Sequence, residues 1–172
     1  PRLIWNTLAI TEQYNGIAIQ SKSGHSFIKD KMREHNAAYG GEMSAHHYFR
    51  DFAYCDSGMI PWLLVIALLS ETEQSLSALV EEMIYQFPCS GEVNFTVADS
   101  QATIEKLLSH YALQNPILDH SDGVSLDFGS WRFNVRASNT EPLLRLNIES
   151  RLDQHPKAMS EYIEELSALI QD

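Results

Sequence analysis

Residues 40–47 (GGEMSAHH) carry several side chains able to do chemistry. A carboxylate, a hydroxyl and two imidazoles follow two glycines, which leave the backbone free to turn sharply and let a ligand approach. Glu42 and Ser44 lie two positions apart, so in an extended segment both side chains point to the same side. An acceptor beside a donor/acceptor can grip two neighbouring sugar hydroxyls. An ordinary polar turn explains the spacing equally well.

A second segment, residues 136–142 (RASNTEP), has the composition of an anion site. The guanidinium of Arg136 offers a fork of donors that matches phosphate oxygens. Further donors come from hydroxyls, a side-chain amide and turn N–H groups, which together form a concave nest. The residues that supply them are Ser138, Asn139 and Thr140. Taken alone, the segment is more simply a hairpin whose serine and asparagine close a turn.

Three other side chains are candidates for ligand contact. Lys22 and His25 flank the start of a predicted helix, whose free N–H groups can assist an anion. A lone histidine at such a position is more often a cap or a packing residue. The imidazole of His46 can hydrogen-bond a phosphate, or transfer a proton near neutrality, because a free histidine side chain titrates near ~6.5.

A zinc site is the alternative use of the histidines. His25, His46, His47 and Cys55 could supply four ligands, but no pair of them has the spacing of a structural zinc site. We therefore expect no metal ligands in this chain, and expect His47 to pack at the entrance of the site.

Together, the first two segments resemble the α-D-phosphohexomutase superfamily, the four-domain enzymes that include phosphomannomutase and phosphoglucomutase. Residues 40–47 look like that family's sugar-recognition loop, G-E-M-S-G-H, and residues 136–142 like its phosphate-binding loop, R-A-S-N-T-x-P. Residues 22–29 (KSGHSFIK) are similar to a third family segment, K-T-G-H-S-x-I-K. The resemblance covers only the third and fourth domains. It implies the C-terminal half of such an enzyme, which the missing initial Met also suits.

The resemblance assigns roles to these residues. The implied sugar-binding residues are Lys22, His25, Glu42, Ser44 and His46, and the implied phosphate-binding residues are Arg136, Ser138, Asn139 and Thr140. His46 is also the one candidate for proton transfer. Two positions depart from the family pattern: Ala45 replaces the usual glycine, and Glu141 replaces a neutral residue. We expect Glu141 to point outward, because an inward carboxylate would weaken phosphate binding.

The resemblance also implies a mechanism for the intact enzyme. A phosphoserine of the first domain phosphorylates a hexose phosphate, the resulting hexose 1,6-bisphosphate turns around, and the enzyme takes back the other phosphoryl group. Mg²⁺, held by an aspartate-rich loop of the second domain, neutralises the transferring charge. Neither the T-A-S-H-N-P serine loop nor the D-G-D-G-D-R metal loop occurs in this sequence. We therefore expect the fragment alone to be inactive and to position hexose phosphates.

Met43 points to the phosphomannomutase/phosphoglucomutase branch, since the phosphoglucosamine mutase branch tends to carry glutamine there. Mannose and glucose differ at one hydroxyl, a difference of about 1–3 kcal/mol if one contact is lost, and the sequence does not rank them.

Two other classes of function stay open. The chain could be a stand-alone phosphosugar-binding module without catalysis, or a structural or protein-interaction domain that responds to no ligand.

Composition narrows the partners. A net charge of −11 argues against nucleic acid and anionic membranes, which need basic surface. The most apolar run, residues 59–69, is shorter than the ~20 residues of a membrane span. Cys55 and Cys89 are interpreted as buried, reduced thiols. No targeting segment is visible, so we expect a cytoplasmic protein, and we expect a monomer.

Residues 1–88 are predicted to form an α/β domain. Short apolar runs at 3–5, 17–19 and 37–39 indicate strands, and they alternate with helical patterns. Helices are predicted at 25–34 and 76–87, and a helix buried on all sides at 62–69. This alternation predicts a parallel-type mixed sheet with packed helices. Residues 88–91 (PCSG) break the pattern and mark the expected domain boundary.

Residues 91–172 are predicted to form an α+β domain. Apolar and polar residues alternate at 93–97, 124–128, 131–135 and 144–148, the pattern of strands with one covered and one wet face. Helical patterns lie between the first two of these runs and after the last, at Ile104–Tyr111 and Met159–Ile170. The order predicts a four-stranded antiparallel sheet with two helices on one face. The resemblance implies a TATA-binding-protein-like fold.

Overall fold

A computed structural model describes residues 2–138, 141–151 and 157–171. The chain divides into two compact units. Unit 1 comprises Pro1–Ala18 and Met83–Asp172, and unit 2 comprises Ile19–Glu82. Each unit is described by itself.

Unit 1 is built on a five-stranded antiparallel sheet, in the order β4-β8-β7-β6-β5. Its strands are β4 (Cys89–Thr96), β5 (Ile117–Asp119), β6 (Val124–Asp127), β7 (Trp131–Ala137) and β8 (Leu143–Ser150). The alternating segments of the sequence correspond to β4, β6, β7 and β8. The expected four strands are corrected to five, because β5 has only three residues and is too short to show an alternating pattern.

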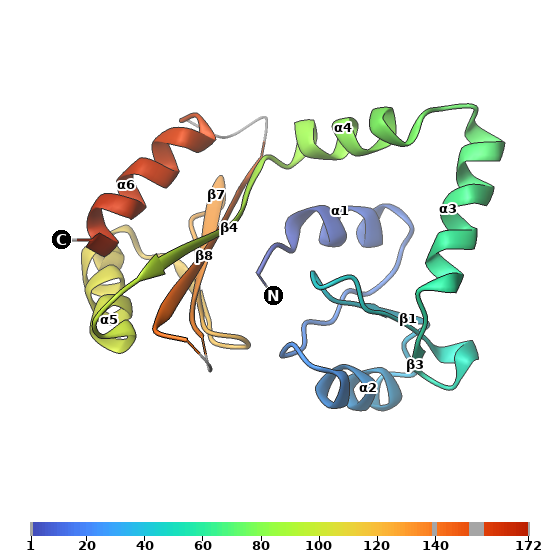
Figure 1. Ribbon diagram of the computed structural model, residues 1–172, viewed down its shortest axis with the longest axis horizontal. Coiled ribbons are helices and arrows are strands. Elements are labelled where there is room, and N and C mark those ends of the chain that lie inside the picture. Colours follow the sequence, from blue (N-terminus) through green and yellow to red (C-terminus); the bar gives the residue numbers. More distant parts are fainter. Residues whose placement is uncertain (1, 139–140, 152–156, 172) are drawn as a thin grey trace. The chain divides into compact units, whose positions relative to one another are not determined.

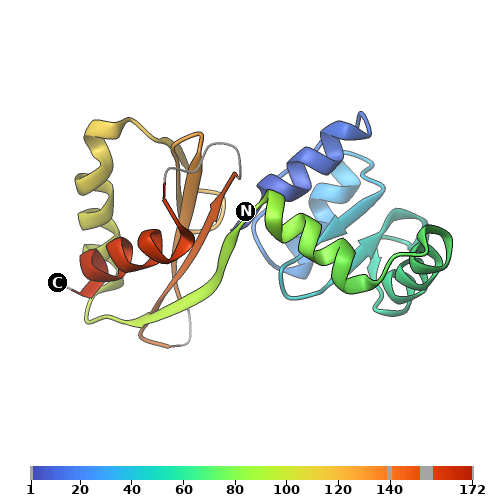
Figure 2. The same ribbon diagram turned by 90° about the horizontal axis from the view of Figure 1, so that it is seen from above.

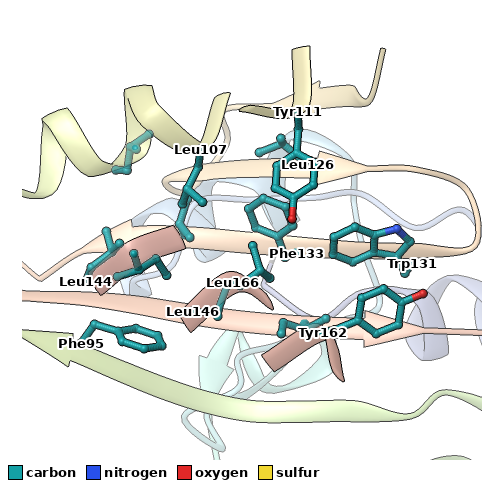
Figure 3. Close-up of a cluster of buried hydrophobic side chains, with 14 residues drawn as sticks. Phe95, Leu107, Tyr111, Leu126, Trp131, Phe133, Leu144, Leu146, Tyr162 and Leu166 are labelled. Carbon is teal, nitrogen blue, oxygen red and sulfur yellow. The ribbon is translucent and has the colours of Figure 1, made fainter. Parts of the chain in front are cut away.

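Helices α5 (Ser100–Tyr111) and α6 (Met159–Gln171) cover one face of this sheet, as the sequence predicts (Figures 1 and 2). The Asp99 carboxylate caps α5 by accepting the backbone N–H groups of Gln101 and Ala102. Alternate residues of β4, β6, β7 and β8 point at the helices and form a buried core with them (Figure 3). The labelled members are Phe95, Leu107, Tyr111, Leu126, Trp131, Phe133, Leu144, Leu146, Tyr162 and Leu166.

The opposite face of the sheet is polar, but it is not the wet face that the sequence predicts. Arg132 and Glu149 form an ion pair of 2.6 Å there, with side chains only 2% and 3% exposed. The Glu149 carboxylate also accepts the backbone N–H groups of Ile4, at 2.8 Å, and Trp5, at 3.0 Å. These are free donors of the first turn of α1 (Trp5–Gln13). The strand expected at 3–5 is therefore wrong, because a distant carboxylate stabilises a helix start.

Unit 2 contains a small sheet, two whole α-helices and the first part of a third. The sheet has the order β1-β2-β3, with β1 (Tyr39–Gly41), β2 (His47–Phe49) and β3 (Cys55–Asp56) all paired antiparallel. Helix α2 (His25–Glu34) packs Ile28 and Met32 against Tyr48. The short connections between these strands permit only hairpins, since a parallel pair needs a longer crossover.

The parallel sheet predicted for this region is therefore wrong in the described residues. The strand predicted at 17–19 is absent as well, and the side chain of Ile17 is 88% exposed. A strand requires a hydrogen-bonding partner along its edge, and none of the described segments pairs with residues 17–19.

Helices α3 (Met59–Thr72) and α4 (Leu76–Gln86) follow the small sheet, with α4 crossing the division between the units (Figure 1). The helix predicted at 62–69 is present, but its expected burial is wrong: Trp62 and Leu64 are 56% and 57% exposed. Among the described helices, none alone has the length and apolarity to cross a membrane. Only α3 and α4 taken together do, with a bend of 97° between them.

The two cysteines are free thiols, as expected, but both are exposed rather than buried. Cys55 opens the two-residue strand β3, and Cys89 opens β4 at the edge of the larger sheet. Such short or peripheral strands leave side chains open to solvent.

Candidate functional site

The loop between β1 and β2 is a tight turn. Glu42 N–H donates to the His46 carbonyl at 3.0 Å, and Ala45 N–H donates to the Glu42 carbonyl at 3.0 Å. Ala45 has φ 63°, in the left-handed region that favours glycine. The extended geometry expected for Glu42 and Ser44 is therefore wrong, because the chain turns at residues 43–44, and Ser44 is exposed.

The first glycine before this turn serves packing. A Cβ on Gly40 would lie 2.8 Å from the sulfur of Met32 and 3.0 Å from a methyl of Ile28. Gly40 lies within β1 rather than in the turn. Its missing side chain lets α2 approach the strand, and so places the start of α2 beside the loop.

The Glu42 carboxylate ties the loop to the start of α2. One oxygen accepts the backbone N–H of Gly24 at 3.0 Å, and the other accepts the Tyr48 hydroxyl at 2.6 Å. Tyr48 is fully buried, and burial together with the Glu42 hydrogen bond raises the pKa of its phenol. A carboxylate has about four lone-pair directions, so Glu42 can still accept further hydroxyl donors.

Two imidazoles and a carboxylate gather beside Glu42. The rings of His25 and His46 lie 4.6 Å apart between centroids, at 62° to each other. His46 Nδ1 lies 2.7 Å from one carboxylate oxygen of Asp56, and the other oxygen accepts the backbone N–H of His47 at 2.9 Å. The hydrogen bond from His46, with that from the His47 N–H, lowers the pKa of Asp56. An ionised Asp56 thus orients the His46 ring through Nδ1, and the other ring nitrogen, Nε2, takes no part in this hydrogen bond.

Asp56 is a site residue that the sequence analysis missed. It lies on the two-residue strand β3, just before α3 begins at Met59. Asp56 meets His46 because β3 pairs with β2, a contact ten positions apart in the sequence. The only sign of this contact in the sequence is that His46 and Asp56 lie on either side of a short segment rich in aromatic residues.

The remaining sugar-site candidates lie at the edge of this cluster. Lys22 is exposed, with its Nζ 5.1 Å from the centroid of the Phe27 ring. His47 Nδ1 is hydrogen-bonded to the Tyr39 hydroxyl at 2.6 Å, which agrees with a packing role. The structure thus brings His25, Glu42 and His46 together through Tyr48 and Asp56, and leaves Lys22 and Ser44 in solvent.

Arg136 lies near the end of β7 in unit 1. Gly123, with φ 74°, allows a close approach: a Cβ there would lie 2.9 Å from the Cβ of Arg136. The Nε of Arg136 is buried, and among the described residues no acceptor bonds it. Burial lowers the pKa of this guanidinium, and the positive charge of Arg2 lowers it further. An arriving anion would supply the missing acceptor.

Acidic side chains hold the neighbouring arginines. Glu92 lies 3.2 Å from Arg2 and 3.3 Å from Arg145. Glu141 is exposed as expected, and its carboxylate lies 3.7 Å from Arg145. The positive charge of Arg2, Arg136 and Arg145 is therefore partly neutralised before any ligand binds.

The loop after β7 is described only in part. Ser138 N–H donates to the Leu143 carbonyl at 2.8 Å, which closes the hairpin. Asn139 and Thr140, the other two phosphate-site candidates, lie outside the described residues.

Two family models match this chain. "Phosphoglucomutase/phosphomannomutase, alpha/beta/alpha domain III" matches residues 4–87. "Phosphoglucomutase/phosphomannomutase, C-terminal domain" matches residues 92–166. The two matches are consecutive and together span most of the chain.

Several curated relatives are similar over nearly the whole chain. A protein of Xanthomonas campestris named "Phosphohexose mutases" is 61% identical over 153 residues, which are 89% of this chain and 34% of the relative. "Phosphomannomutase" of Vibrio cholerae is 53% identical over 171 residues, 99% of this chain and 36% of the relative. "Phosphomannomutase" of Salmonella typhimurium is 55% identical over 153 residues, 89% and 34% of the two chains. This chain spans about a third of the length of these relatives.

A solved structure from Burkholderia thailandensis shares the fold. It is titled as a phosphoglucomutase/phosphomannomutase family protein, with a TM-score of 0.73 at 23% identity, over 97% of this chain and 35% of that one. The predicted organisation, an α/β domain followed by an antiparallel sheet with helices, is confirmed by these matches.

Proposed function

This chain belongs to the phosphoglucomutase/phosphomannomutase family, and from that premise we propose that it binds the hexose phosphate in an enzyme interconverting hexose 6-phosphate and hexose 1-phosphate. Its relatives are named as phosphohexose mutases and phosphomannomutases. The observation that supports the proposal most is the cluster of Glu42, His25 and His46 on one loop and the start of one helix. Such a cluster offers both acceptors and donors to the hydroxyls of a sugar.

Glu42 and Ser44 bind ring hydroxyls of the sugar. The Glu42 carboxylate is held in place by Gly24 N–H and the Tyr48 hydroxyl, so little freedom is lost when a ligand arrives. Ser44 is exposed and can donate or accept as the hydroxyl orientation demands. Lys22 and His25 complete the sugar site, and as cationic or neutral donors they suit a ligand that carries phosphate.

His46 moves the proton of the reacting hydroxyl. Its Nδ1 is hydrogen-bonded to Asp56, so the carboxylate stabilises the charged form of the imidazole as the proton arrives at the other ring nitrogen. Asp56 acts through His46 and is a positioning residue. Without it, His46 would lose both its orientation and the nearby negative charge.

Arg136 and Ser138 bind the phosphate that does not react, with Asn139 and Thr140 as proposed partners outside the described residues. The buried Nε of Arg136 supports this role, because phosphate oxygens would satisfy a donor that has no acceptor among the residues that the structure describes. Binding one end of the substrate places the reacting end for transfer.

The residues of this chain do not fit the Mg²⁺ that the family implies. Magnesium prefers carboxylate, phosphate and water oxygens in an octahedral arrangement, whereas the described cluster at His25, His46 and Asp56 holds two imidazoles. No step of the reaction is therefore assigned to a metal held by this chain. Magnesium, the phosphoserine and the 1,6-bisphosphate belong to the proposed whole enzyme, and the chain alone is proposed to be inactive.

The family domains are proposed to meet at residues 88–91, in keeping with the gap between the two matched ranges. The whole protein is proposed to be cytoplasmic and monomeric, with specificity of the mannose/glucose type.

Calorimetric titration of the 172-residue chain with mannose 1-phosphate and glucose 1-phosphate tests the proposal. We expect millimolar binding, and expect Glu42→Gln and Arg136→Ala each to weaken it about tenfold, which corresponds to about 1.4 kcal/mol. Arg33→Ala is the matched control, because Arg33 is an exposed arginine of α2. Binding that is absent in the wild type, or unchanged in both site variants, would contradict the proposal.

The stand-alone binding module, which the sequence analysis left open, is the second candidate. It predicts the same binding but no contribution to turnover. Glu42→Gln and Arg136→Ala in the longest natural protein that contains this chain separate the two. A mutase loses kcat/KM in both variants, whereas a binding module shows no mutase activity to lose.

A further inference from the structure

We propose that His25, His46 and Asp56 form a binding site for a divalent transition-metal ion, for which Zn²⁺ is the reference probe. Each residue offers one ligand atom, and these three atoms all lie within 4.8 Å of one another. All three residues belong to unit 2, so the site is complete within a single unit.

The donor set selects the kind of metal. Two imidazole nitrogens and one carboxylate oxygen match the three-ligand zinc sites that keep a fourth position open. Imidazole also suits copper and nickel, whereas magnesium and calcium prefer all-oxygen sites. The ion expected here is therefore borderline in softness, and the site discriminates against the Mg²⁺ that the family implies.

The geometry requires only a small rearrangement to accept an ion. Zinc bonds of about 2.0–2.2 Å in tetrahedral arrangement place neighbouring ligand atoms about 3.3 Å apart. His46 Nδ1 and the Asp56 oxygen are now 2.7 Å apart and share a proton. Replacing that proton by a metal ion opens the pair by about half an ångström. His25 moves inward, and it is free to do so because it is exposed at the first turn of α2.

Hydrogen bonds behind the ligands hold the carboxylate in position. The second oxygen of Asp56 accepts the backbone N–H of His47, whose ring is bonded to the Tyr39 hydroxyl at 2.6 Å. Partners of this kind fix ligand orientation, and their loss costs about 10–100-fold in metal affinity. His46 and Asp56 are partly buried and His25 is exposed, so an ion can enter from solvent.

This site differs from the zinc arrangement considered from the sequence. His25 lies at the start of α2, and His46 lies in the loop between β1 and β2. Asp56 lies on β3, which pairs with β2. Sequence spacing does not reveal it, because the fold rather than a local motif brings the ligands together. His47 is turned to Tyr39 instead.

The ion has a consequence for ligand binding, and this part rests on the proposed function. An ion bound to His25, His46 Nδ1 and Asp56 would remove the hydrogen bond that orients His46 and would draw His25 away from a sugar. Zinc is therefore expected to compete with a hexose phosphate at the sugar loop and, in an intact mutase, to inhibit.

Calorimetric titration of the 172-residue chain with ZnCl₂ in a non-chelating buffer tests the site. We expect one saturable site per chain, weakened at least about tenfold in His25→Ala, His46→Ala and Asp56→Asn. His35→Ala is the matched control, since His35 is an exposed histidine at the end of α2. Equal zinc affinity in the wild type and the three site variants would overturn the proposal, as would absence of saturable binding.

Cobalt provides an independent readout of coordination. Co²⁺ bound by these nitrogen and oxygen ligands is expected to give visible absorption bands that disappear in His46→Ala and persist in His35→Ala. Asp56→Asn keeps the shape of the side chain, so it reports the lost charge even if an alanine at this position loosened the hairpin. Unchanged cobalt spectra in folded Asp56→Asn and His46→Ala would contradict the site.

Competition is measured separately. Mannose 1-phosphate is expected to weaken zinc binding, and methyl phosphate at the same concentration controls for chelation in solution. If the two compounds weaken zinc binding equally, the proposal that zinc and the sugar compete for His25 and His46 is wrong. The zinc site and the phosphosugar site themselves are tested by their separate titrations.

Discussion

Unit 1 and unit 2 differ in how completely their apolar side chains are covered. In the described part of unit 1, fourteen buried residues form one continuous core between the sheet and the helices α5 and α6. The buried core of unit 2, counted over its described residues, has three members, Ile28, Met32 and Tyr48. Among the described residues of α3, none is buried, although the helix is apolar on all sides.

The difference shows two ways of holding a loop that is a candidate for ligand binding. In unit 1, Arg136 extends from a central strand whose alternate residues are locked in a packed core. In unit 2, Glu42 and His46 are positioned mainly by hydrogen bonds to Gly24, Tyr48 and Asp56. The position of Arg136 therefore depends on packing, whereas the positions of Glu42 and His46 depend on a small network of hydrogen bonds.

Truncation of the unit 1 core should have the largest effect. Phe133 is fully buried among aromatic neighbours, so Phe133→Ala is expected to lower the free energy of unfolding by about 4 kcal/mol. The control is Leu64→Ala on α3, whose side chain is mostly exposed and should cost no more than about 0.5 kcal/mol. Urea unfolding followed by hydrogen exchange in each unit measures both. Equal losses would remove the contrast between the units.

The buried ion pair comes next. Glu149→Ala leaves Arg132 buried without its carboxylate and removes the acceptor at the start of α1, so we expect a loss of about 3 kcal/mol. Amide exchange in α1 should accelerate more than in α5. Glu164→Ala, an exposed glutamate of α6, is the control. Slow exchange in α1 of the Glu149 variant would show that the helix does not depend on this carboxylate.

A glycine of unit 2 tests its smaller core. Gly40→Ala places a methyl against Met32 and Ile28 and is expected to cost about 1–2 kcal/mol. The side chain of Met32 is flexible, which keeps the cost moderate. Gly58→Ala is the control, because a Cβ there meets no atom within 4 Å. Thermal unfolding compares the two variants, and equal stability would mean that α2 does not pack closely on β1.

The smallest expected effect concerns Glu165 on α6. Its hydrogen bond with Lys157, and a second one from the Tyr111 hydroxyl, lower the pKa of this carboxyl below its ordinary 4.5. A lowered pKa in the folded state means that ionised Glu165 stabilises unit 1 fully above the unfolded-state pKa near 4.5. This stabilisation is lost as the pH falls through the lower pKa of the folded state. Glu165→Gln should therefore cost about 0.5 kcal/mol at pH 7 and nothing in acid.

Stability curves of the wild type and Glu165→Gln between neutral and acid pH check this prediction. Glu164→Gln is the control, since Glu164 neighbours it in sequence and is exposed. A difference between wild type and Glu165→Gln that persists unchanged in acid would contradict the assigned cause.

Local patterns predicted unit 1 better than unit 2. Alternation along 131–135 and 144–148 marks the covered face directly, because a sheet with helices on one side imposes a period of two. Unit 2 has no comparable rule: Ile17 looks like part of a buried strand but has no pairing partner among the described segments. Continuous apolar runs give no information about which element would cover them.

The candidate site was likewise predictable only where it is local. Residues 42–46 and 136–138 stand in recognisable segments, whereas Asp56 joins His46 through strand pairing. The Arg132–Glu149 pair was missed because alternation marks both residues as polar and therefore as solvent-exposed. Burial of that face depends on the start of α1, which lies more than a hundred positions away in the sequence.

The account as a whole requires that the two loops bind one and the same hexose phosphate. Titration of the isotope-labelled chain with mannose 1-phosphate, followed by NMR of the Glu42, His46 and Ser138 amides, tests this most directly. We predict that all three amides shift with a single dissociation constant, and that Arg136→Ala weakens all three responses together. Shifts confined to one loop, or two separate dissociation constants, would contradict it.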